Sequence, residues 1–137
     1  MNAGSPPATT YYSFEVDGEP IPQGSMRSPK AGVVLHSNAK LAGWRNTVSG
    51  EARKAYSGKP WDGPVLVALT FIVKPPLHNR ELYASKKPDL DKLIRACLDA
   101  LDGIVYVNDS RVVRIEAEKV YAGGGMEPGV TVEVWLR

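Results

Sequence analysis

The sequence has 137 residues, of which 43% are hydrophobic and 23% charged, with a net charge of +2. One domain of this size can bury its own core, and the balance of hydrophobic and charged residues excludes wholesale disorder. No apolar run approaches the roughly 20 residues that cross a bilayer, and the lone Cys97 excludes an internal disulfide, which predicts a cytoplasmic protein.

The chain begins with MNAGSPPATT, which lacks the basic start and apolar stretch of a secretory signal. We expect a disordered tail over residues 1–10 and a single domain over residues 11–137. Residues 11–16 predict a first strand, and the sequence DGEP after it favours a turn. Three prolines and two glycines in residues 20–37 then predict a long irregular loop.

Residues 38–56 predict a helix that Asn38 could cap. Its apolar side chains fall near one face, and its basic side chains lie on the others. Those basic side chains suit a solvated surface as well as they suit DNA.

Residues 65–73 form a nearly unbroken, β-branched apolar run, typical of a central strand buried on both faces. Residues 112–121 and 130–136 alternate between apolar and polar positions, with three consecutive glycines between them, which predicts an antiparallel hairpin. The sum is an α/β (α+β) fold: one compact domain with a mixed sheet of about four strands and two main helices.

Charge is unevenly distributed along the chain. Residues 22–59 hold seven basic side chains against one acidic, and residues 74–87 hold four against one, whereas residues 88–110 hold five aspartates against two basic side chains. A basic surface around an acidic pocket suits a phosphate polymer held near a cation, although blocks in sequence need not be patches in space.

The segment of residues 74–87, KPPLHNRELYASKK, is basic and interrupted by prolines, and a loop this long is usually functional or mobile. Its candidates for contacting backbone phosphates are Lys74, Arg80, Lys86 and Lys87. Tyr83 is a candidate for stacking on a base or wedging into DNA, and simple packing would explain it equally well.

The next segment, PDLDKLIRACLDALDG, predicts a second helix with leucines on one face. At about 100° per residue, a polar row falls in a separate sector roughly 80° wide. That row consists of Asp91, Arg95, Asp99 and Asp102. Asp89 is placed as the N-cap, and Gly103 as the stop.

Each of these aspartates has an ordinary structural explanation. Asp89 could cap amides, Asp91 could be favoured in the first turn by the helix dipole, and Asp99 could pair with Arg95. If the strand that begins at residue 112 pairs beside residues 65–73, however, Asp109 could approach the start of the helix. Carboxylates converging there would repel one another unless a hard cation such as Mg²⁺ neutralised them.

The stretch KPDLDKLIRACLDALDGIVYVNDSRVV, residues 87–113, resembles the RusA family of Holliday junction resolvases, small enzymes of phage and prophage origin. The resemblance implies that Asp89, Asp91 and Asp109 bind the metal and that Asp99 is structural. It also implies a homodimer with a mixed sheet and helices that cleaves four-way DNA junctions symmetrically.

Two residues depart from the family pattern. Arg95 stands where the family commonly has a catalytic lysine; it keeps the charge but does not readily release a proton. Asn108 replaces the first acid of a common acidic pair, which removes one possible ligand.

The resulting hypothesis is a structure-selective endodeoxyribonuclease of recombination and repair. Asp89, Asp91 and Asp109 would supply oxygens to Mg²⁺, for which Mn²⁺ could substitute, and Arg95 would contact the phosphate or the leaving oxygen. The alternatives are a magnesium nuclease for flaps or single strands, a weak or inactive dimer that binds branched DNA, and an interaction protein whose aspartates are only caps.

Overall fold

Seven elements follow one another along the computed structural model, which describes residues 10–24 and 31–137. They are β1 (Tyr11–Asp17), α1 (Ala31–Ala55), β2 (Val65–Val73), α2 (Leu90–Leu101), the 3-10 turn η1 (Asp109–Arg111), β3 (Val112–Tyr121) and β4 (Gly129–Leu136). The predicted α+β domain with a four-stranded mixed sheet and two helices is confirmed. All of the expected N-terminal tail except Thr10 lies outside the described residues.

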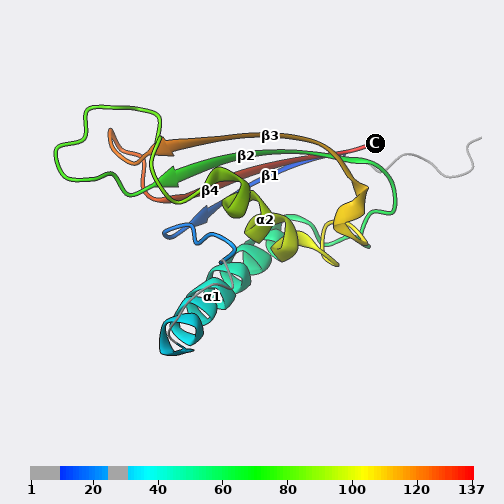
Figure 1. Ribbon diagram of the computed structural model, residues 1–137. Helices are drawn as coiled ribbons and strands as arrows, with labels where there is room; N and C mark the ends of the chain where they lie inside the picture. The colour runs from blue at the N-terminus through cyan, green and yellow to red at the C-terminus, as the bar shows by residue number, and fades with distance from the viewer. Residues whose placement is uncertain (1–9, 25–30) are drawn as a thin grey trace, which may run out of the picture.

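The strands are ordered β1-β4-β2-β3 across the sheet (Figure 1). β2 and β3 are parallel, and β4 runs antiparallel to both of its neighbours. The predicted hairpin between residues 112–121 and 130–136 is therefore wrong, because β2 separates these two strands. Alternation indicates that a strand has one buried face, but it does not identify the neighbouring strand. Gly123, Gly124 and Gly125 all have positive φ angles in the turn between them.

Both helices lie on the same side of the sheet (Figure 1). Along β2, the residues that face them, from Val65 through Phe71 to Val73, are 0–2% exposed. The alternate residues, from Leu66 to Ile72, are only half-buried. The expectation that this strand is buried on both faces is therefore wrong: within the described residues, no helix covers the second face. An unbroken apolar run cannot distinguish these two situations.

The first helix, α1, begins at Ala31, seven residues before the predicted start at Asn38. The irregular loop expected over residues 20–37 is therefore wrong for residues 31–37; the helix starts soon after Pro29, the last of the three prolines. Trp44, Val48 and Ala52 of α1 are buried as predicted. None of the described helices is long and apolar enough to cross a bilayer.

The second helix, α2, packs its apolar face into the core, where Leu93, Cys97 and Leu101 are fully buried. It ends where predicted, because Gly103 takes a positive φ of 75° just beyond it. The Ser49 hydroxyl of α1 donates a 2.7 Å hydrogen bond to the carbonyl of Ala100, which fixes the two helices against each other.

Candidate active site

The outer face of α2 carries the predicted polar row, since its inner face is occupied by core residues. Asp91 lies in the first turn, and Arg95 follows one turn later; both side chains are exposed. The carboxylates of this row are spread along the helix: at about 1.5 Å of rise per residue, Asp91 and Asp99 are roughly 12 Å apart along its axis.

Asp89 occupies the N-cap position of α2, as predicted, but its side chain makes no capping hydrogen bond. Its carboxylate instead pairs with Lys92 at 3.6 Å. This ion pair is exposed and contributes little to stability. The capping explanation for the Asp89 carboxylate is therefore not supported by a hydrogen bond.

Asp109 lies in η1, immediately before β3. The side chain of Asn108 caps this turn by accepting a 2.9 Å hydrogen bond from the amide of Ser110. The carboxylate of Asp102, just beyond the end of α2, lies near Asp109; burial, followed by the negative charge of Asp109, raises its pKa. The carboxylate of Asp109 is exposed.

A shallow hollow of about 230 Å³ lies along the outer face of α2 and reaches η1. It is lined by Asp91, Ile94, Arg95, Leu98, Asp99 and Asp109. The structure thus brings three of the four predicted catalytic residues to one hollow, whereas Asp89 is not part of its lining. Among the described residues, no side-chain hydrogen bond or ion pair engages Asp91, Arg95 or Asp109.

Asp99 is engaged with α1 rather than with its own helix. Its carboxylate forms a 3.0 Å ion pair with Arg45, which also donates to the side-chain oxygen of Gln23. The proposed pairing of Asp99 with Arg95 is therefore wrong within the described residues. Asp99 has a partner that joins the two helices.

Two residues beside the hollow were not predicted as part of the site. Partial burial of its carboxylate, followed by the negative charge of Asp109, raises the pKa of Asp102 above its ordinary value. Burial, followed by the charge of Asp102, raises the pKa of Tyr106, whose hydroxyl donates a 2.6 Å hydrogen bond to the carbonyl of Leu98. Negative charge is thus concentrated where η1 meets the end of α2.

The hollow suits a metal ion only in part. Within the described residues, no group of three histidine, cysteine, aspartate or glutamate side chains could hold a metal ion. Asp91 and Asp109 nevertheless offer free oxygen ligands to the same hollow, and Mg²⁺ usually takes one or two protein carboxylates together with waters and substrate phosphate. Asp91 and Asp109 therefore fit part of such a site, and the three-aspartate set stays a prediction.

Comparison with known proteins shows the family of this chain. The family described as endodeoxyribonuclease RusA matches residues 17–135, which is most of the chain. The chain belongs to the RusA family. It is also 28% identical over 137 aligned residues to an uncharacterized protein, YqaN, from Bacillus subtilis (strain 168), with 88% of this chain and 93% of that protein covered.

RusA enzymes are endodeoxyribonucleases that resolve Holliday junctions. Both departures of this chain from the RusA pattern can now be located. Arg95, in the position of the common lysine, is exposed and lines the hollow together with Asp91 and Asp109. Asn108 directs its oxygen to the amide of Ser110, so it stabilises η1.

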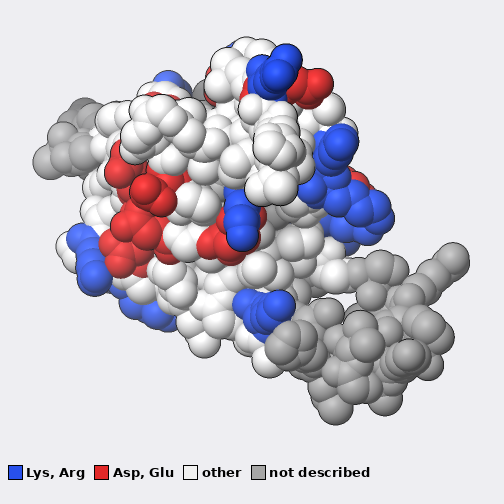
Figure 2. Space-filling view, turned by 90° about the vertical axis from the view of Figure 1, so that its left-hand side faces the viewer, with Lys and Arg blue, Asp and Glu red and all other residues white. Residues whose placement is uncertain are grey.

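The basic loop of residues 74–87 runs alongside the outer edge of β3, where Tyr83 forms an isolated bridge with Val120. Tyr83 is nevertheless 62% exposed, so packing against the rest of the protein buries only the smaller part of this residue. The four basic candidates of this loop, Lys74, Arg80, Lys86 and Lys87, are all exposed. Figure 2 shows that the end of the molecule carrying this loop has acidic side chains on its left and a separate basic group on its right.

Proposed function

We propose that this RusA-family chain resolves Holliday junctions in the cytoplasm, during recombination and repair, by paired and symmetric Mg²⁺-dependent cuts. One observation carries the proposal: Asp91, Arg95 and Asp109 line a single surface hollow and have no side-chain partners among the described residues. Charged groups left unpaired at one exposed place are available to a ligand. A phage or prophage source stays a prediction.

In this proposal, Asp91 and Asp109 hold the metal, with Asp89 contributing from the start of α2. A bound magnesium ion supplies Lewis-acid polarisation of the scissile phosphodiester, and Mn²⁺ could replace it. Arg95 contacts the phosphate and stabilises its charge by donating hydrogen bonds. Since a guanidinium does not readily release a proton, Arg95 has an electrostatic role.

The basic loop of residues 74–87 would bind the DNA backbone. Its four cations would contact backbone phosphates, which gives affinity without reading sequence. Tyr83 offers an exposed ring to an unstacked base at the branch point. A homodimer would present two identical sites to opposing strands, because a four-way junction has approximate two-fold symmetry.

One feature favours a second candidate, a weak or inactive dimer that binds branched DNA. Arg95 replaces the lysine common in the family, and the described part of one chain forms no group of three metal ligands. Binding without cutting would then be the activity, and the same hollow would only recognise phosphate.

Cleavage of synthetic DNA substrates distinguishes the two candidate functions. Cutting of a four-way junction, a linear duplex and a flap of equal length would be compared with and without Mg²⁺. The proposal predicts Mg²⁺-dependent cuts confined to the junction. Equal cutting of the duplex or the flap would indicate a general magnesium nuclease, and tight junction binding without cuts would indicate the binding dimer.

A further inference from the structure

The outer edge of β3 is only partly covered. At its C-terminal end, the amide of Ala84 donates to the carbonyl of Lys119 at 3.0 Å, and the amide of Tyr121 donates to the carbonyl of Leu82 at 2.9 Å. Alternate residues of a strand direct their backbone groups to the same edge. The backbone groups of Ala117 and Ile115 therefore also face outward, where no described strand pairs with them.

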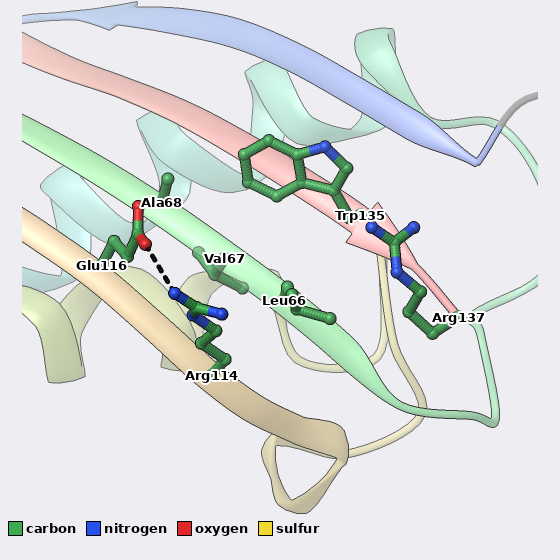
Figure 3. Close-up of a pocket in the computed structure, with 7 residues that line it drawn as sticks. All are labelled: Leu66, Val67, Ala68, Arg114, Glu116, Trp135 and Arg137. Carbon is green, nitrogen blue, oxygen red and sulfur yellow. Dashed lines mark hydrogen bonds and ion pairs between the residues drawn. The ribbon is translucent and has the colours of Figure 1, made fainter.

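This uncovered stretch, residues 112–118, contains no proline, and no strand or helix of the described residues covers its outer edge. Natural edge strands are usually guarded by charge, by proline or by a covering segment. Here Val113 is 64% exposed and Ile115 is 41% exposed. The side chains of Arg114 and Glu116 are 66% and 68% exposed and form an ion pair with each other at 3.1 Å (Figure 3).

The stretch is complementary to itself when it is read in the opposite direction. Antiparallel pairing centred on Ile115 sets Ile115 against its own copy. It sets Arg114 against Glu116 of the other copy, and Val113 against Ala117. Within residues 113–117, each apolar residue thus meets an apolar residue and each charge meets its opposite, whereas Val112 at the end of the stretch meets Glu118. The centre of this pattern coincides with the middle of residues 112–118.

We propose that β3 pairs antiparallel with β3 of a second copy, centred on Ile115. This deepens the proposed function, since it rests on the homodimer inferred there. Two-fold pairing would join two four-stranded sheets into one and would form two reciprocal Arg114–Glu116 ion pairs. A bulge at Val113, opposite the step from Val65 to Leu66, marks the end of regular pairing.

The other edge of the sheet lacks this complementarity. β1, with the sequence YYSFEVD, contains two carboxylates and no cation. Pairing of β1 with a second β1 would leave Glu15 and Asp17 without a countercharge in any register. Charge therefore selects β3 over β1 as the contact between copies.

The register also has a consequence for the site. Regular pairing about Ile115 ends at the bulge at Val113, and beyond it η1 of one copy continues toward the Tyr121 end of β3 of the other. Tyr121 bonds to the segment at Leu82, and the same segment leads into α2 at Asp89. Dimer formation would therefore bring η1 of each copy toward the helix start of the other.

The test uses charge reversal and mixing, and it reads mass by sedimentation equilibrium without DNA. Arg114→Glu sets like charges opposite each other, and so does Glu116→Arg; each is expected to weaken dimerisation at least roughly tenfold, since like charges directly opposite destabilise a pair of strands. An equimolar mixture of the two variants, and the double variant Arg114→Glu/Glu116→Arg, should regain twice the mass of one chain. Recovery on mixing would also show that each variant is folded.

Matched controls are Arg53→Glu and Glu127→Arg, which reverse exposed charges outside β3 and should dimerise as the unaltered chain does. A monomeric unaltered protein, dimers unaffected by either edge variant, or a mixture that stays monomeric would overturn the proposal. The mass measurement does not depend on cleavage. A dimer that behaves as expected but cuts no junction would contradict the proposed function and leave the β3 contact intact.

Discussion

Arg111 donates two hydrogen bonds, of 2.9 and 2.7 Å, to a single carboxylate oxygen of Asp62. Arg111 closes η1, and Asp62 lies in the segment that leads into β2, so the contact fastens the turn that carries Asp109. Two backbone hydrogen bonds between Trp61 and the chain at Val105 and Val107 support the same junction. Asp109 therefore owes its place to a contact across 49 residues of sequence.

Loss of this contact should affect cleavage more than stability. Both side chains are exposed, and exposed ion pairs contribute at most about 1 kcal/mol. We expect Arg111→Gln and Asp62→Asn to lower single-turnover junction cleavage roughly tenfold, the cost of about 1.4 kcal/mol in the transition state. Urea unfolding should change little.

The exchanged pair Asp62→Arg/Arg111→Asp provides the control for position. It should recover part of the lost cleavage, because it restores the contact with its charges reversed. Cleavage at the unaltered rate in both single variants would show that η1 holds Asp109 without this pair.

Arg95 gives a second prediction. A lysine in its place can both stabilise the phosphate and release a proton, whereas arginine can only stabilise. We expect Arg95→Lys to cut junctions several-fold faster at pH 8 and Arg95→Gln to cut more slowly, with junction affinity measured in parallel. Slower junction cleavage by Arg95→Lys would show that a bidentate guanidinium contact is needed to hold the phosphate.

The ion pair between α1 and α2 should be measurable as stability. Arg45 and Asp99 are each about one-third exposed at the side chain, so solvent screening reduces the strength of the pair. We expect a double-mutant cycle with Arg45→Met and Asp99→Asn to give a coupling free energy of about 1 kcal/mol in urea unfolding. A coupling free energy near zero would show that the contact of Arg45 with Asp99 adds no stability, which would leave its hydrogen bond to Gln23 as the stabilising contact.

The buried thiol predicts a pH dependence. Burial raises the pKa of Cys97 from its ordinary value of 9.0 to about 12. The folded protein therefore holds this proton more tightly than the unfolded chain. The resulting stabilisation is complete below pH 9.0 and is lost as the pH rises toward 12, by up to about 1.4 kcal/mol per pH unit.

Cys97→Ala isolates this effect, because every other titrating group is shared by the two proteins. The difference in free energy of unfolding between the unaltered chain and Cys97→Ala should shrink between pH 8 and pH 10.5. A difference that does not change with pH would show that the folded thiol ionises normally.

The parts of the fold that could be predicted from the sequence are those set by local periodicity. The leucine spacing and Gly103 defined α2 to within a residue, since both signals lie inside the element. The order of strands could not be predicted, because β3 and β4 show the same alternation whichever strand lies beside them. The start of α1 was also missed, since prolines and glycines before it indicated a loop.

The residues of the candidate site were likewise only partly predictable from the sequence. The polar row of α2 follows from helical geometry, and Asp109 was identified through the family pattern. Asp62 and Arg45 were not predicted as partners of Arg111 and Asp99, because their contacts depend on how distant segments pack. Asp102 was visible as a member of the row, but its closeness to Asp109 had no signal in the sequence.

The central claim is that the carboxylates beside Arg95 make this chain a junction resolvase, and mapping of nicks tests it most directly. End-labelled four-way junctions would be incubated with Mg²⁺ and either the unaltered protein or Asp91→Asn, and cuts on all four strands would be located. We predict paired cuts at symmetric positions on opposing strands for the unaltered protein, and retained junction binding without cuts for Asp91→Asn. Unpaired cuts, or the same cuts from Asp91→Asn, would contradict the account.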